Sequence, residues 1–489
     1  MAFIDSTVVN VALPALQSSF HASIVDVQWV VESYGLFLAA LILVGGALGD
    51  ALGRRIVFLA GIVIFASASA GCGLASSING LILWRSFQGI GAAMLVPGSL
   101  AIISASFDEK SRGRAIGTWS GFTAITSALG PVLGGWLIEH ASWRWVFFIN
   151  LPLAAAVVVI ALWRVPESRS SSKASIDWLG ALSVTVGLAS VVYGLLESST
   201  HGWTDPLVLG TLLLGAACIA LFLFIEQHAS SPMVPLKLLR SPAFGGANLL
   251  TLLLYSALGI FFFLFPSNLI QVHRYSATAS GAASLPLILL MFLFSRWSGG
   301  LVTRYGKRPP LIAGPIVVAI GFFLCLLPSI GGTYWKTYFP GVVMLGAGLA
   351  ITVAPLTTTV MSSVNTNQVG TASGINNAVA RLAGVLAIAV LGIVMVNAFA
   401  YRLEKGMAGL QVTEQARAQI HSERVKLAAM PIPADMDTAT GARLKVDLRE
   451  AFLFGFRIIM LCCAFLALAS SLIAAKFIRQ DVSTPPLRE

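Results

Sequence analysis

Long, continuous apolar stretches recur through the chain and constrain its fold more than any other feature. A helix needs about 20 apolar residues to cross the hydrocarbon core of a bilayer, whereas the strands of a membrane β-barrel alternate apolar and polar residues. The stretches do not alternate. We therefore predict an all-α integral membrane protein with fourteen transmembrane helices, at approximately residues 1–18, 26–48, 56–77, 80–105, 114–138, 146–164, 177–197, 206–225, 243–266, 276–302, 309–330, 336–361, 371–398 and 452–475.

The composition agrees with this prediction. Apolar residues make up 57% of the 489 residues, and charged residues only 11%. Because soluble domains carry about 25% charged residues, an ordinary soluble enzyme and a disordered protein are excluded. The net charge of +10 does not indicate nucleic-acid binding, since the basic residues are scattered singly between apolar stretches. The cysteines and histidines show no metal-binding or disulfide spacing, so we expect no metal site.

The distribution of Lys and Arg predicts the orientation of the chain. If the N-terminus is cytoplasmic, sixteen basic residues fall in cytoplasmic segments and three in the short outer loops. Cytoplasmic loops carry such an excess, so we expect both termini to be cytoplasmic. The outer segment 399–451 carries eight further basic residues together with acids. Parts of it, at 417–426 and 442–450, could form short surface helices, and the segment is either functional or a solvated cap.

The start of the chain is unusual for a membrane protein. Met1 is followed almost at once by Asp5, without a basic segment between them, so this is not a signal peptide. The first stretch is also short. Either the first helix is abbreviated or the true start lies upstream, and we favour the second interpretation.

An internal repeat divides the chain. Residues Gly46–Arg55 resemble Gly299–Arg308, with four identities and no gap. The two segments occupy equivalent positions in two six-helix halves if helices 7 and 8 are an inserted pair, and repeated halves are typical of transporters. The predicted divisions are an N-terminal six-helix bundle (1–164), the inserted pair with linkers (165–242), the first five helices of the C-terminal bundle (243–398), the long outer loop (399–451), and the last helix with the tail (452–489).

The segment Gly46–Arg55 resembles the signature loop of the major facilitator superfamily. Its glycines allow a tight turn and a close approach of two helices. The resemblance implies that Asp50 pairs with a basic partner and latches one state of the transport cycle. Since Ala51 stands where the family usually has Arg, Arg54 or Arg55 would supply the charge; alternatively these charges only fix topology. The candidate gating residues of this loop are Gly46, Asp50, Gly53, Arg54 and Arg55.

The fourth predicted helix carries a second resemblance. Residues Leu81–Ala93 are similar to a superfamily motif that places a basic residue, here Arg85, inside an apolar stretch. A buried cation is costly unless it is paired or hydrated. The resemblance links Arg85 to proton handling and adds Gln88 and Gly89 as gating residues. The alternative is a structural arginine held by backbone carbonyls.

The fifth predicted helix carries the most discriminating motif. Residues Ser127–Trp136 resemble the superfamily's antiporter motif, with Thr126 where the family has a further glycine. Two of its small residues share one helix face, and its proline kinks the helix. The resemblance implies an exporter that runs as an antiporter, and generic helix packing is the alternative. The candidate conformational residues are Gly130, Pro131, Gly134 and Gly135.

Two further segments, Asp5–Pro14 and Trp143–Pro152, resemble the fourteen-helix drug:proton antiporter branch of the superfamily. The resemblance implies a major facilitator fold with helices arranged 6+2+6 in two pseudo-symmetric halves. It also implies efflux of small amphipathic molecules, driven by the proton gradient without a cofactor, by a monomer in the lipid bilayer that is not an enzyme. A dedicated transporter of one polar or anionic metabolite is the alternative, and a non-transporting receptor is a remote one.

An antiporter needs a group that binds a proton in competition with its substrate, and a membrane carboxylate can do this. The candidates are Asp5 and Glu32, with Asn10 as a polar neighbour in the first helix. Asp5 could instead act in folding, and Glu32 could face the cavity or point outward.

The C-terminal half offers a different set of polar groups. Helices 9 to 12 carry no embedded acid, and helix 13 carries Asn376, Asn377 and Arg381. These residues could receive an anionic or polar compound. Arg381 could instead form an ion pair with Asp5 or Glu32 across the two halves.

Overall fold

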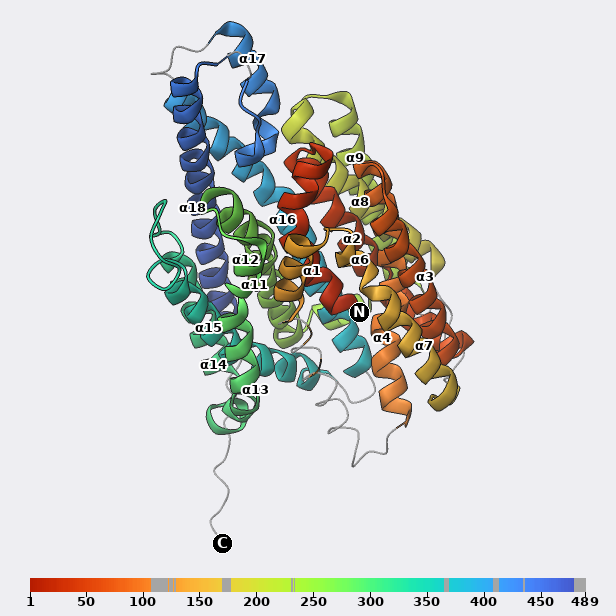
Figure 1. Ribbon diagram of the computed structural model, residues 1–489. Coiled ribbons are helices and arrows are strands. Elements are labelled where there is room, and N and C mark those ends of the chain that lie inside the picture. Colours follow the sequence, from red (N-terminus) through yellow and green to blue (C-terminus); the bar gives the residue numbers. More distant parts are fainter. Residues whose placement is uncertain are drawn as a thin grey trace.

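The computed structural model describes residues 1–106, 122, 126, 129–168, 177–229, 232, 234–364, 369–407, 413–433 and 436–478, and every regular element in this part is a helix. Eleven helices of this part are long and apolar enough to cross a membrane, and Arg308–Leu324 is a shorter apolar helix. The prediction of an all-α, multi-pass membrane protein is confirmed. The helices form an elongated bundle (Figure 1). We call the end that carries α17 the upper end, and the end where α2 and α18 finish the lower end.

The first half of the chain forms one group of helices. The first residue lies at about half the height of the bundle, and α1 rises from there to the upper end (Figure 1). Residues 129–140 are also helical. The named helices are α1 (Ala2–Phe20), α2 (Ile24–Leu52), α3 (Arg54–Leu74), α4 (Ile78–Ser106), α6 (Trp145–Phe148) and α7 (Asn150–Arg164).

Two helices then form a hairpin on the outside of the bundle. They are α8 (Trp178–His201) and α9 (Pro206–His228). Asp177 and Asp205 cap their N-termini by accepting hydrogen bonds from backbone N–H groups of the first turn. The inner member, α8, packs against both α2 and α16, so the pair touches both halves of the chain.

The second half contains the remaining helices. They are α10 (Leu236–Leu239), α11 (Pro242–Ser267), the π-helix η1 (Asn268–Val272), α12 (Ala277–Ala282), α13 (Leu285–Tyr305), α14 (Arg308–Leu324), α15 (Phe339–Ser362), α16 (Val369–Met407), α17 (Glu414–Glu423), the 3₁₀-helix η3 (Arg424–Ala429) and α18 (Thr438–Phe477).

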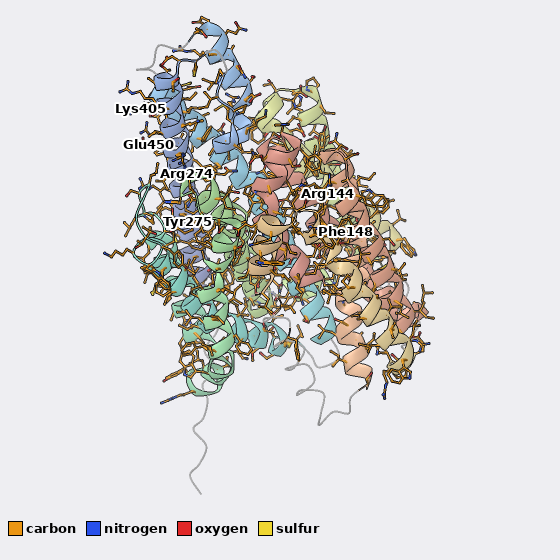
Figure 2. The ribbon with its side chains drawn as sticks, viewed as in Figure 1. Arg144, Phe148, Arg274, Tyr275, Lys405 and Glu450 are labelled. Carbon is orange, nitrogen blue, oxygen red and sulfur yellow. The ribbon has the colours of Figure 1, made fainter. Side chains whose placement is uncertain are left out.

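Much of the segment predicted as a long loop is helical. The helix expected at 442–450 is the first part of α18, and the one expected at 417–426 corresponds to α17 and η3. Arg402 and Glu450 form an ion pair of 2.6 Å that joins α16 to α18, and Figure 2 shows Glu450 beside Lys405 near the upper end. α16 and α18 are therefore longer than predicted, because the predicted boundaries followed the apolar stretches and both helices extend beyond them into amphipathic sequence.

The two halves repeat their close helix contacts. The repeated loops both turn at a glycine with positive φ, Gly53 (φ 120°) and Gly306 (φ 79°). After the first loop, α3 and α4 cross at Gly61, where a Cβ would lie 2.9 Å from the Gly91 carbonyl oxygen. After the second, α14 and α15 cross at Gly348, where a Cβ would lie 2.6 Å from the Val318 nitrogen. Neither crossing leaves room for a side chain.

The crossing of α14 and α15 gives a stability prediction. Gly348→Leu is expected to lower the free energy of unfolding by at least about 1–3 kcal/mol, because the rigid backbone at Val318 cannot yield to a side chain. Thermal unfolding in detergent measures this loss. The matched control is Gly210→Leu on α9, where nothing lies within 4 Å of the Cβ position. Equal melting temperatures for the two variants would contradict the close crossing.

Candidate functional site

A polar network lies in the interior of the first half, and we call it the Asp5 network. Its members come from α1, α3, α4 and α7 and are all buried: Asp5, Ser69, Arg85, Gln88 and Asn150. Asp5 is at its centre. One carboxylate oxygen pairs with Arg85 Nη1 at 2.6 Å, and the other accepts from Gln88 Nε2 at 2.8 Å and from Asn150 Nδ2 at 3.1 Å.

Most of the remaining polar groups of the network are also bonded, although the Asn150 Oδ1 atom is buried and finds no hydrogen-bond partner among the described residues. Arg85 donates through Nε to the Val30 carbonyl at 3.0 Å and through Nη1 to Gln88 Oε1 at 2.7 Å. Ser69 Oγ accepts from Gln88 and Asn150 and donates to the Phe147 carbonyl at 2.8 Å. Arg85 is thus held by a carboxylate and by a backbone carbonyl together. A buried ion pair needs such additional bonds to offset the desolvation of both charges.

Tyr34 of α2 covers the arginine. Its ring centroid lies 4.2 Å from the Arg85 Cζ atom, within the range of a cation–π contact. Gly89 makes this approach possible, because a Cβ there would lie 2.6 Å from the Tyr34 carbonyl oxygen. The side chain of Tyr34 therefore forms one wall of the Asp5 network.

The second acidic candidate is not part of this network. Glu32 is fully buried on α2, and neither of its carboxylate oxygens has a hydrogen-bond partner among the residues that the structure describes. It points neither to lipid nor to solvent. Asn10 lies half-buried further along α1, and no hydrogen bond between described residues connects it to Asp5.

The three polar residues predicted for a site in the second half do not lie in one common environment. Asn376 donates to Asn248 at 3.1 Å and to Thr251 at 2.7 Å, so its amide ties α16 to α11. Asn377 is exposed and donates to the Ser373 carbonyl of its own helix. Arg381 is half-buried on α16. The alternative of an ion pair between Arg381 and Asp5 or Glu32 is not found among the described contacts, since Asp5 pairs with Arg85 within its own half and no described residue donates to the Glu32 carboxylate.

The repeated loop at the lower end has an unexpected partner. Glu167, just after α7, accepts hydrogen bonds from the backbone N–H groups of Arg55 and Ile56 at 3.1 and 3.2 Å, so it caps α3. The Arg55 side chain lies 3.9 Å from the same carboxylate and donates to the Val165 carbonyl, while the Arg54 N–H donates to the Ser168 carbonyl. The side chain of Asp50, the residue predicted to latch this loop, lies outside the described part.

The loop gives a prediction at Glu167. Glu167→Ala is expected to destabilise the start of α3 by about 1–2 kcal/mol, because two N–H groups lose their cap. Glu167→Gln is the intermediate variant, since its amide oxygen can still accept from one of the two N–H groups, whereas its amide nitrogen cannot accept from the other. Hydrogen exchange of the Arg55 and Ile56 amides measures the effect. Equal protection in the alanine variant and the wild type would show that Glu167 is not a cap.

The antiporter-like motif lies at the contact between the halves. Gly130 and Gly134 share one face and pack against Thr7 and Val8 of α1. The neighbouring face meets α12: a Cβ on Gly135 would overlap the Ala277 carbonyl, and one on Gly281 would overlap the carbonyl of Pro131. The described residues of this motif therefore form a tightly packed seam between α1 and the second half.

Further contacts close the upper end. The backbone N–H and the hydroxyl of Thr278 donate to the two Glu139 oxygens at 2.8 and 2.7 Å. Slight burial raises the pKa of Glu139, but hydrogen bonds from Ser276 and Thr278 outweigh this effect and hold the pKa below its usual value. Glu139 is therefore ionised at neutral pH.

A second group of upper-end contacts centres on α1. Gln271 of η1 donates to Gln17 of α1 at 3.0 Å, and Gln17 in turn donates to the Lys426 carbonyl of η3. The extra residue per turn of a π-helix turns Gln271 out of the α-helical register of α11. η3 itself contacts α1, α2, η1, α16 and α18. The segment between α16 and α18 is thus attached to both halves.

Sequence reasoning missed several of these residues as site residues. Ser69, Tyr34 and Glu167 carry no motif signal of their own, and their roles follow only from helix packing. Asn150 stands inside the Trp143–Pro152 motif, so its polar side chain at the start of an apolar helix was an available signal.

Comparison with known proteins identifies the class. The profile described as Major Facilitator Superfamily matches residues 1–388. The chain belongs to this superfamily and is a multi-pass membrane transporter, not an enzyme.

Individual relatives refine the comparison. The tetracenomycin C resistance and export protein of Streptomyces glaucescens is 34% identical over 401 residues, covering 81% of this chain and 74% of the relative. The multidrug resistance protein Stp of Mycobacterium tuberculosis is 35% identical over 396 residues, covering 81% and 73%. The puromycin resistance protein pur8 of Streptomyces alboniger is 32% identical over 407 residues, covering 82% and 80%.

Solved structures agree on the fold. An inward-facing, unoccupied bacterial homologue of the human lysosomal transporter Spinster superposes with a TM-score of 0.66 at 18% identity, covering 98% of this chain and 96% of that one. The xylose transporter XylE from E. coli, in an inward-open conformation, gives 0.57 at 14% identity, covering 99% and 94%.

Proposed function

We propose that this transporter exports small amphipathic molecules, drugs or antibiotics, in exchange for protons by alternating access. The observation that carries the proposal is the buried ion pair between Asp5 of α1 and Arg85 of α4. The names of the relatives, which include resistance and export proteins, support the direction and the class of cargo.

The Asp5 network provides the groups that such an exchange needs. A proton bound at Asp5 neutralises the carboxylate and leaves Arg85 as a buried cation without its counter-ion, which is costly. This cost favours a rearrangement of α1, α3, α4 and α7, the helices that carry the network. A driving force of about 150 mV supplies roughly 3.5 kcal/mol per charge, enough for a gradient of roughly 300-fold per proton. Neither ATP nor a cofactor is required.

The architecture is part of the proposal. We assign fourteen transmembrane helices in a 6+2+6 arrangement, with the boundaries 1–164, 165–242, 243–398, 399–451 and 452–489. Both termini are cytoplasmic, and the upper end faces the outside of a bacterial inner membrane. The protein acts as a monomer in the lipid bilayer and binds no nucleic acid. The contacts between the halves at the upper end then correspond to a conformation closed to the outside.

The second candidate is a dedicated carrier of one polar or anionic compound. It is favoured by the charge of the second half: no acidic residue occurs between Pro242 and Ala400, whereas Arg381 lies on α16. An anion would find an attractive field there and no carboxylate to repel it.

Uptake into energised inverted vesicles tests both candidates. The panel contains ethidium as a lipophilic cation, puromycin as an amphipathic drug and carboxyfluorescein as an anion. We expect uptake of ethidium or puromycin that a protonophore abolishes and that Asp5→Asn lacks. Uptake of carboxyfluorescein alone, lost in Arg381→Ala, would establish the second candidate. Uptake of any compound that persists with protonophore would contradict proton exchange.

A further inference from the structure

Glu32 is a buried acid that the Asp5 network does not use. Its side chain is 0% exposed, and neither carboxylate oxygen accepts a hydrogen bond from any described residue. Asp5, by comparison, is equally buried but accepts three hydrogen bonds, one of them from a paired arginine. Buried polar groups are nearly always bonded, so the bare carboxyl of Glu32 requires an explanation.

The contacts of neighbouring residues on α2 show which face of this helix carries Glu32. Gln28, one turn before it, donates to the Ile388 carbonyl of α16 at 3.3 Å, and Gly35, nearly one turn after it, faces Val385 of the same helix. The ring of Trp29 packs against Tyr193 of α8 in a tilted arrangement, with 5.9 Å between the ring centroids. Because residues three and four apart share a helix face, Glu32 lies where α2, α8 and α16 meet. We call this place the Glu32 junction.

The opposite face of α2 meets the Asp5 network. The Val30 carbonyl accepts a hydrogen bond from Arg85, and the Tyr34 ring covers the Arg85 guanidinium. The thickness of α2 therefore separates Glu32 from the Asp5–Arg85 pair. The two carboxyl groups are distinct sites on two sides of one helix.

No charged group among the described residues bonds to the carboxyl of Glu32. The ionisable groups of the three helices near this level are Tyr34 on α2, Tyr193 and Glu197 on α8, and Arg381 on α16. None of them forms a hydrogen bond or an ion pair with Glu32 among the described contacts, and Glu197 pairs instead with His201. An ionised carboxylate without a partner in such a site is strongly disfavoured, so Glu32 carries its proton in this conformation.

We propose that Glu32 is a second proton-binding site, which holds its proton while α2, α8 and α16 are packed together and releases it when α2 and α16 move apart. This inference rests on the proposed function, because the relative movement of the halves supplies the change. α2 belongs to the first half and α16 to the second, so alternating access changes the hydration of their contact. The hairpin of α8 and α9 has a role in this proposal, because α8 shields the Glu32 carboxyl from water.

Infrared spectroscopy of the purified protein tests the proton directly and needs no substrate. We expect wild type at neutral pH to show the carbonyl band of a protonated carboxylic acid, and Glu32→Gln to lack it. Glu197→Gln, on the half-exposed end of α8, is the matched control and should keep the band. A spectrum of Glu32→Gln identical to that of the wild type in this region would overturn the proposal.

A second variant tests the role of α8. Tyr193→Ala removes the ring that packs against Trp29 and should admit water to the junction. We expect the protonated-acid band to disappear at a pH at least one unit lower than in the wild type. This measurement also stands if Glu32→Gln fails to fold. An unchanged titration would show that α8 does not shield the carboxyl.

Transport then tests the use of that proton. In proteoliposomes with ethidium or puromycin, Glu32→Gln should keep substrate–substrate exchange but reach a steady gradient at least ten-fold smaller at the same driving force. If Glu32→Gln instead loses substrate–substrate exchange, and the number of protons exchanged per substrate stays that of the wild type, Glu32 binds the cationic substrate and the proposal is overturned. Asp5→Asn distinguishes a failure of the proposed function from a failure of the Glu32 proposal. If this variant keeps proton-driven transport, the proposed function fails, while the infrared result on Glu32 is unaffected.

Discussion

Asp5→Asn is expected to abolish proton-driven export and to destabilise the first half by about 3–5 kcal/mol, the usual cost of removing one partner of a buried ion pair. The reason is Arg85, which keeps its charge and has only 1% of its side chain exposed. Asparagine can still bond to Gln88, but it cannot compensate the cation. Thermal unfolding measures the first effect, and protonophore-sensitive uptake into inverted vesicles measures the second.

The double variant Asp5→Asn, Arg85→Met separates stability from function. Removing both charges should restore most of the lost stability, because no uncompensated ion remains. Export should stay absent, because no titratable group is left at this position. A double variant that exports against a gradient would show that the pair is only structural.

Gly281→Val is expected to reduce export at least 100-fold while leaving the fold of each half intact. The added carbons meet the Pro131 carbonyl across the seam, and backbone in a packed helix cannot yield. The upper end then cannot close, and a transporter that cannot close one end cannot alternate. Labelling of a single cysteine placed at Gln17, in a chain without its native cysteines, reports the opening.

Gly384→Val on α16 is the matched control, since nothing lies within 4 Å of its Cβ position. It should keep wild-type labelling and most of the export. If Gly281→Val leaves the cysteine at Gln17 as protected as in the wild type, the seam is not the contact that closes this end.

The fold was predictable because its strongest signals are local. The length of the apolar stretches predicted the helices. The loop repeated at Gly46–Arg55 and Gly299–Arg308 predicted two similar halves, and both halves contain a close helix crossing after this loop. The helix ends above the membrane were not predictable in this way. α16 and α18 continue as amphipathic helices joined by Arg402 and Glu450, and hydropathy alone does not register such a continuation.

The site was predictable only in part, for a physical reason. Asp5, Arg85 and Gln88 stood out because charged or amide groups in apolar stretches need partners. Which partners they have depends on the rotation of each helix about its axis, so Ser69, Tyr34 and Asn150 entered only with the packing. The same rotation decides that Glu32 and Tyr34, two residues apart, face opposite sides of α2.

The attachment of η3 has a consequence for how this transporter can be stopped. η3 contacts α1 and α2 on one side and α16 and α18 on the other, and the Lys426 carbonyl holds Gln17. Opening of the upper end must detach η3 from one half in every cycle. In the proposed orientation this segment faces the medium, and a segment that follows the second half would separate from α1 and α2. An antibody fragment bound across η3 and the exposed connection between α1 and α2 at His21 would hold the exit shut. Such a blocker would act without crossing the membrane and without competing for the cargo.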